Sequence, residues 1–138
     1  MVPSTQPLIA IISDDPSFNY LIRRYADRIG YSISVVPNPL SVETILQPKP
    51  NAVIFPSVVN LEHSQPLVTA LANSDIPIIV CSAMVDQTRT RELGADYCML
   101  HPLVYDNFSS VLETVIQSQR ENNINNNLGQ GIPPINPV

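Results

Sequence analysis

The stretch Ile76-Pro77-Ile78-Ile79-Val80-Cys81-Ser82-Ala83 decides the fold. It is a short, nearly continuous apolar run that is rich in β-branched residues and too short for an ordinary helix. Such a run is typical of a strand that is buried on both faces of a sheet. A strand of this kind needs helices above and below it, so the stretch predicts the centre of a parallel α/β sheet.

Four more strands are expected outward from this centre. Apolar runs predict three of them, and an alternating pattern predicts a fourth, half-exposed strand near a sheet edge: residues 8–13, 51–55, 97–100 and 31–36. Helix-period apolar positions predict the helices between them: residues 16–29, 40–47, 61–73, 86–93 and 105–119. Residues 58–60 are expected to form a loop, and Pro66 implies a late start or a kink in the third helix. The elements therefore alternate strand and helix five times.

Composition limits the classes of function. The chain has 138 residues, a net charge of −5 and 14% charged residues, with no basic run or basic helical face. We therefore expect no binding to nucleic acid or to anionic membranes, because both need clustered Lys and Arg. No apolar stretch approaches the length of a membrane span, so we expect a soluble, cytoplasmic protein.

The chain divides into one domain and two flanking segments. Residues 1–7 are expected to be a loose arm, and residues 8–119 form the domain. Residues 120–138 are rich in Asn and Pro and cannot bury a core, so we expect a disordered tail.

Ligands of such sheets bind at the carboxyl ends of the strands. This chain places four dipeptides there: Asp14-Asp15, Pro56-Ser57, Ser82-Ala83 and His101-Pro102. Together with Pro77–Ala83 and the run Gly94-Ala95-Asp96, this pattern resembles the receiver domain of bacterial response regulators, the family of the chemotaxis protein CheY. The resemblance covers roughly residues 8–119. It implies a flavodoxin-like, three-layer (βα)5 sandwich with a five-stranded parallel sheet of strand order 2-1-3-4-5.

The resemblance also implies a chemistry. Receiver domains take a phosphoryl group from a histidine kinase onto an aspartate, with Mg²⁺ bound by that aspartate and an acidic pair. By this resemblance Asp14 and Asp15 match the acidic pair, and Ser82 matches the hydroxyl residue on the fourth strand. Pro102 matches the proline that follows the family's lysine, and the peptide before it is expected to be cis.

Three positions depart from the family pattern. Pro56 stands at the phosphoacceptor, His101 at the lysine and Cys98 at the aromatic switch position. Proline offers neither a nucleophile nor a metal ligand, so Mg²⁺ affinity should drop sharply. We expect no cofactor, with Asp14 and Asp15 as weak residual candidates for a cation. The pattern resembles a pseudo-receiver that keeps the fold and has lost phosphotransfer.

We therefore expect a non-enzymatic protein-interaction module in two-component-type signalling. Its partner would be a histidine kinase, another receiver or a regulator, and it would be a monomer or a homodimer. The resemblance implies an interaction face on helix 86–93, strand 97–100 and helix 105–119, with Arg89, Tyr97, Cys98 and Tyr105. Two alternatives stay open: a small-ligand or cation sensor that uses the crevice at the strand carboxyl ends, and an atypical phosphoacceptor.

Several side chains have competing interpretations. Asp15 suits the N-cap of the helix that begins at Pro16. Ser57 is a poor match for a displaced phosphoacceptor, since the chemistry uses a carboxylate. Ser82 is expected to bond a backbone group at a strand end. His101 is expected to pair with Asp14 or Asp15, or to act as a pH switch; Cys81 and Cys98 are weighed as buried thiols or a redox pair.

Overall fold

The computed structural model describes residues 6–37 and 42–131 of the chain. Its five strands form one parallel sheet in the order β2-β1-β3-β4-β5. The strands are β1 (Leu8–Ile11), β2 (Ser32–Val35), β3 (Ala52–Phe55), β4 (Ile78–Ser82) and β5 (Tyr97–Leu100). This confirms the predicted (βα)5 sheet and its strand order.

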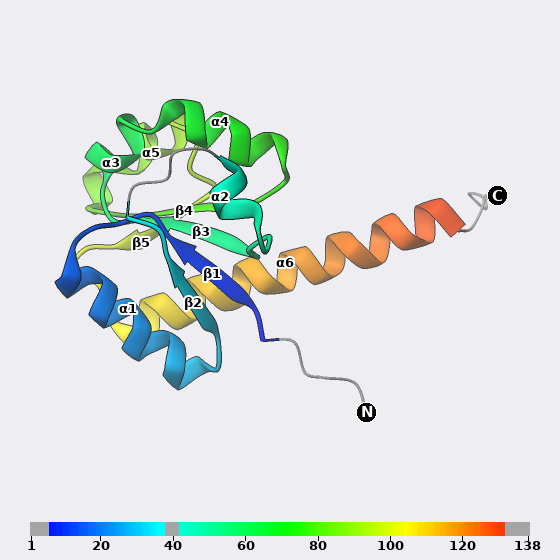
Figure 1. Cartoon of the computed structure of the whole chain (residues 1–138), viewed down its shortest axis with the longest axis horizontal. Helices are drawn as coiled ribbons and strands as arrows, with labels where there is room; N and C mark the ends of the chain where they lie inside the picture. Colours follow the sequence, from blue (N-terminus) through cyan, green and yellow to red (C-terminus); the bar gives the residue numbers. More distant parts are fainter. Residues whose placement is uncertain (1–5, 38–41, 132–138) are drawn as a thin grey trace.

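Helices cover both faces of the sheet (Figure 1). One face carries α1 (Pro16–Ile29) and α6 (Tyr105–Gly131). The other carries α2 (Val42–Leu46), α3 (Val58–Glu62), α4 (Gln65–Asn73) and α5 (Gln87–Glu92), which follows a short 3-10 turn at Met84–Asp86. The result is the predicted three-layer sandwich.

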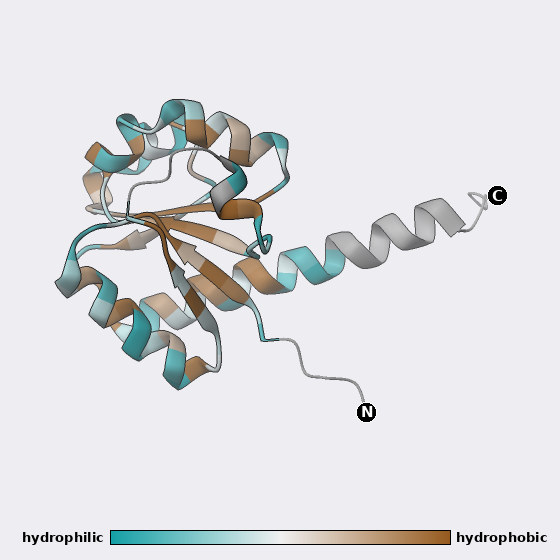
Figure 2. Cartoon of the chain, in the orientation of Figure 1, coloured by the Kyte–Doolittle hydropathy of each residue, from teal (hydrophilic) through white to brown (hydrophobic). Residues whose placement is uncertain are grey.

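The central strands are buried on both faces, as their sequence predicts. All five residues of β4 and all four of β3 are buried. Alternate residues point to opposite layers: Ile79 packs with α1 and α6, whereas Ile78 and Val80 pack with the other helices. The strands consist mostly of hydrophobic residues, whereas the helices carry both hydrophobic and hydrophilic residues (Figure 2). The edge strand β2 is only half-buried, which confirms that prediction.

The segment after β3 differs from the sequence prediction. The predicted loop at 58–60 is wrong, because α3 begins at Val58. The helix predicted at 61–73 is divided, because its first residues belong to α3. The late start implied by Pro66 is confirmed, since α4 begins at Gln65 with Pro66 in its first turn. Ser57 caps α3, and a proline ring starts a helix well but cannot continue one. Leu40 and Ser41, the start of the predicted 40–47 helix, lie outside the described residues.

The helix that closes the fold is longer than predicted. We expected the last helix to end near residue 119 and the tail to be disordered, but α6 continues to Gly131 and runs out beyond the sheet (Figure 1). A helix that is already anchored against the core needs no new nucleus to extend. Residues 105–131 contain no proline, and the first one after them is Pro133. The expectation for 132–138, like that for residues 1–5, falls outside the described residues. Within the described part of the chain, none of the helices has the length and hydropathy needed to cross a membrane.

Candidate functional site

The predicted site residues meet at one edge of the sheet. Because all five strands are parallel, the segments that follow β1, β3, β4 and β5 leave the sheet on the same side (Figure 1). We call residues 13–15, 56–60, 82–86 and 101–106 the carboxyl edge. In a doubly wound sheet this is the side where ligands bind.

The two aspartates of this edge have different roles. Asp15 is the N-cap of α1: its Oδ1 accepts hydrogen bonds from Ser17 N at 2.9 Å and Phe18 N at 3.3 Å. The backbone N–H of Asp15 donates in turn to the hydroxyl of Ser13, which is buried. Asp14 is exposed, and within the described residues its carboxylate makes no hydrogen bond or ion pair. The helix start therefore occupies one carboxylate and leaves the other in solvent.

The residues after β3 offer the fewest reactive or metal-binding side-chain groups of this edge. Pro56 is half-buried directly after Phe55 and offers no side-chain ligand or nucleophile. The next residue, Ser57, caps α3: its Oγ accepts from Asn60 N at 3.2 Å and donates to Asn60 Oδ1 at 2.6 Å. A hydroxyl committed in this way to a helix start is an ordinary structural group.

The ends of β4 and β5 are joined through the backbone. His101 N donates to Ser82 O at 3.0 Å, while the Ser82 hydroxyl is buried and donates to Ala83 O at 3.4 Å. Ser82 therefore bonds a backbone group, as expected. The His101 side chain is exposed, and the predicted pairing with Asp14 or Asp15 is absent from the described residues. The peptide between His101 and Pro102 is cis, which confirms that prediction.

The cysteines are not a redox pair. Both are free thiols, and β4 and β5 pair so that Cys98 lies opposite Val80 and Cys81 lies opposite Met99. Adjacent residues of a strand point to opposite faces, so the two sulfur atoms are on different sides of the sheet. Cys98 Sγ lies 3.0 Å from Thr90 Oγ1. Burial, with a smaller contribution from Cys98, raises the pKa of the Cys81 thiol to about 11, which keeps it protonated and unreactive near neutral pH.

The four residues of the predicted interaction face lie on α5, β5 and α6, and they pack on both sides of the sheet. Cys98 packs on the layer of α2–α5, and Tyr97 packs on the layer of α1 and α6. The Tyr105 ring lies edge-on to Tyr25 at 5.5 Å, with the guanidinium of Arg28 4.0 Å from its centre. Arg89 pairs with Glu62 across α5 and α3. Partner binding by this face stays a prediction.

The residues present do not fit a Mg²⁺ ion. The ion prefers six oxygen ligands at near-ideal octahedral geometry. At the carboxyl edge Pro56 has no side-chain oxygen, and Asp15 Oδ1 accepts the capping hydrogen bonds of α1. Among the described residues no three His, Cys, Asp or Glu side chains are grouped as metal ligands would be.

Sequence interpretation missed a feature of this edge. Val59, Met84, Val85 and Val104 are large apolar side chains that are more than half exposed. The signal was available in part, because Met84 and Val85 follow directly on the apolar run of β4. A continuous apolar run suggests core, however, and sequence alone does not show where the chain leaves the sheet.

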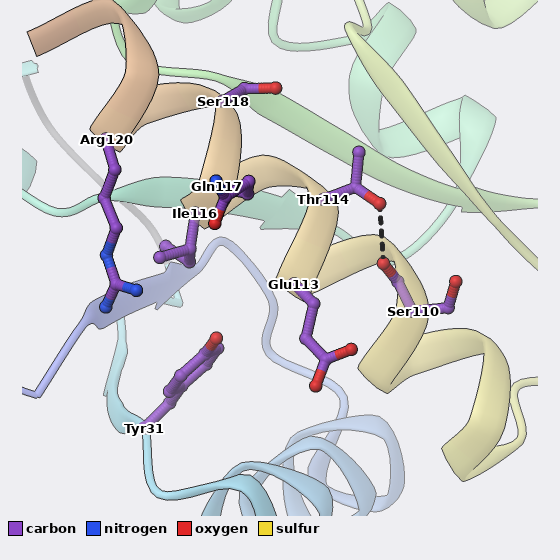
Figure 3. A pocket seen from close by; sticks show the side chains of 8 residues that line it. All are labelled: Tyr31, Ser110, Glu113, Thr114, Ile116, Gln117, Ser118 and Arg120. Atoms are coloured by element: carbon purple, nitrogen blue, oxygen red, sulfur yellow. Dashed lines mark hydrogen bonds between the residues drawn. The ribbon is translucent and has the colours of Figure 1, made fainter. Parts of the chain in front are cut away.

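A separate groove lies near the opposite edge, between α6 and the residue that precedes β2. It has a volume of about 660 Å³, and Tyr31 points between Glu113 and Arg120 (Figure 3). Burial, and then Glu113, raises the pKa of Tyr31, whereas Arg120 opposes that shift. None of the predicted site residues lines this groove.

Solved structures of receiver domains have the same fold as this chain. The chain is similar to a response regulator from Thermotoga maritima, with a TM-score of 0.69, 19% identity and coverage of 82% of this chain and 99% of that one. It has the CheY-like receiver fold. A CheY chemotaxis protein from Vibrio cholerae is similar with a TM-score of 0.66, 12% identity and coverage of 80% and 99%.

A third similar structure shows a metal in the corresponding fold. It is the receiver domain of a sensor histidine kinase from Pseudomonas aeruginosa, with a TM-score of 0.67, 16% identity and coverage of 82% of this chain and 99% of that one. That domain has a magnesium ion in its active-site cleft. No protein-family model matches the sequence, and no curated protein matches it.

Proposed function

We propose that this chain is a receiver-fold protein-interaction module that works without phosphoryl transfer. The observation that carries the proposal is Pro56, which follows β3 where a receiver needs its aspartate. Without that carboxylate the residue after β3 cannot accept the phosphoryl group, since proline has no nucleophile. It also has too few oxygen ligands to hold the metal that neutralises charge in phosphoryl transfer.

The remaining positions support the same proposal. Ser57 and Asp15 use their side chains to start α3 and α1. The exposed His101 has an imidazole where a receiver has a lysine, so it cannot supply the ammonium group of that side chain. A receiver fold that has lost phosphoryl transfer can still bind a partner protein, independently of phosphorylation. We propose a kinase, another receiver or a regulator as that partner.

The proposal is tested by amide NMR with Mg²⁺ and then with beryllofluoride, a mimic of an aspartyl phosphoryl group. We expect no saturable shift at Asp14, Asp15, Ser82 or His101 with either addition. A saturable shift with Mg²⁺ alone would instead support a cation sensor. A further shift with beryllofluoride that spreads to β5 and α6 would support an active phosphoacceptor, and either result would overturn the proposal.

A further inference from the structure

Exposed apolar side chains gather at the carboxyl edge. Among the described residues, five large apolar side chains are more than half exposed, and four of them belong to this edge: Val59 at 58%, Met84 at 66%, Val85 at 90% and Val104 at 53%. They come from the segments after β3, β4 and β5, which are neighbouring strands. The fifth, Tyr20, lies on α1, where Arg24 is 5.9 Å from the centre of its ring.

This grouping has no use within the fold. Single exposed apolar residues are ordinary, but a group at a ligand-binding edge is typical of an interaction site. None of the four side chains belongs to either buried core cluster. Burying each against a partner would remove apolar surface from water, which is the main favourable term in protein association.

The charge of the edge restricts what the partner is. The carboxyl edge contains Asp14, Asp15, Asp86 and Asp106 and has no Lys or Arg. Asp14, Asp15 and Asp106 are exposed. Arg89, the next cation along the chain, is paired with Glu62. Arg28 of α1 lies over the Tyr105 ring, 4.0 Å from its centre, so one cation stands beside four carboxylates and the edge stays acidic. An apolar group with acidic neighbours is complementary to apolar side chains flanked by Lys and Arg, and it repels anionic lipid.

We propose that the carboxyl edge binds a cationic amphipathic helix of a partner protein. Apolar side chains of that helix would contact Met84, Val85, Val59 and Val104, and its Lys or Arg side chains would approach Asp14 and Asp106. Laying an amphipathic helix on an apolar surface is a general mode of peptide recognition. This inference rests on the proposed function, since it assigns the interaction surface and the chemistry of the partner.

The probe for the test is a synthetic amphipathic helix with Leu on one face and Lys on the other, added to the ¹⁵N-labelled full chain. We expect saturable shifts confined to the carboxyl edge, and affinity that falls as salt rises. The double variant Met84→Ser/Val85→Ser should weaken binding by about tenfold or more, because two apolar contacts are lost. Tyr20→Ser, the matched exposed residue elsewhere, should leave affinity unchanged.

Charge is tested with a second pair of variants. Asp14→Asn/Asp106→Asn should weaken binding, whereas Asp27→Asn, an exposed aspartate on α1, should not. A peptide with Glu in place of Lys should not bind, and anionic vesicles should not bind either. Each variant changes exposed side chains, and its thermal melt shows whether it is folded.

Some outcomes would overturn this inference alone. No saturable binding, shifts on another surface, or equal loss in Tyr20→Ser and Met84→Ser/Val85→Ser would do so. If Mg²⁺ and beryllofluoride also leave the edge unchanged, the non-phosphorylatable module survives and only the location or chemistry of its partner is wrong. If beryllofluoride shifts the edge, the proposed function fails whatever the peptide does.

Discussion

The two edges of the sheet use their side chains differently. We call the edge at which the strands begin the amino edge. There Asn51 Oδ1 accepts a hydrogen bond from Leu8 N at 2.8 Å, and Asp96 Oδ2 accepts one from Ile78 N at 2.8 Å. These side chains hold the starts of β1 and β4. At the carboxyl edge, Met84 and Val85 project into solvent and Asp14 makes no bond within the described residues. Both edges thus use polar side chains for the fold, since Asp15 and Ser57 also cap helices, but the carboxyl edge in addition exposes Asp14, Met84 and Val85 to solvent.

The largest effect is expected at Gly94, which precedes β5 at the amino edge. Its φ of +105° is left-handed, and a Cβ there would lie 2.6 Å from Val68 Cγ1. Gly94→Ala should lower the free energy of unfolding by about 2–4 kcal/mol, because backbone strain and overpacking add. Chemical denaturation measures the loss.

Gly30 supplies the control for this prediction. Its φ is +90°, but a Cβ there would have no neighbour within 4 Å. Gly30→Ala should therefore cost only the backbone term, about 1 kcal/mol. Gly94→Ala introduced into a Val68→Ala background should cost much less than in the native chain. Equal costs for Gly94→Ala in both backgrounds would contradict the packing argument.

The next largest effect is expected at Asp96. Asp96→Ala leaves the N–H of the buried Ile78 without its acceptor, which should cost about 1–3 kcal/mol of unfolding free energy. Asp96→Asn keeps an acceptor oxygen and should retain most of the stability. If the two variants melt alike, the hydrogen bond from Ile78 N to Asp96 does not hold the start of β4.

The stabilities of variants at Asp14 and Asp15 are expected to differ, although the two residues are adjacent at the carboxyl edge. Asp15→Ala removes the cap of α1 and should cost about 1 kcal/mol. Asp14→Ala should leave the stability nearly unchanged. Urea unfolding of the two variants compares them directly, and a larger loss for Asp14→Ala would show that its carboxylate has a structural role.

The smallest effect is expected at Val85. Val85→Ala changes a side chain that is 90% exposed, so its stability should stay within about 0.5 kcal/mol of the native value. Val80→Ala, which truncates the same residue type inside β4, should cost about 2 kcal/mol or more. Thermal melts of both variants test this, and a comparable loss in Val85→Ala would mean that the residue packs against the domain.

Much of the fold was predictable because its strands are buried on both faces. The apolar runs of β3 and β4 and the capped helix at Pro16 locate their elements without further information. The strand order came from the resemblance to receivers. The division between α3 and α4 was missed because Val58 and Val59 suggest no helix by themselves; Ser57 and Pro66 decide it. The extension of α6 was missed because the Asn-rich composition shows only that residues 120–138 cannot bury a core of their own. A helix that is anchored at one end does not need such a core to extend.

The site was predictable in its placement but not in its side-chain contacts. Parallel topology alone brings Asp14, Pro56, Ser82 and His101 to one edge. Which face a strand residue points to depends on the register, so the separation of Cys81 from Cys98 needed the pairing of β4 with β5. The contact between Tyr105 and Tyr25 likewise needed the packing of α6 on α1. Exposure of Val85 is a property of the folded surface and not of the sequence pattern.

The most direct test of the central claim is intact-mass spectrometry of the chain after incubation with Mg²⁺ and acetyl phosphate. A receiver domain that carries an aspartate at the end of its third strand serves as the positive control. The account predicts a phosphoryl adduct on the control and none on this chain, because Pro56 supplies no acceptor. A stoichiometric, acid-stable or acid-labile phosphoryl adduct on this chain would contradict it.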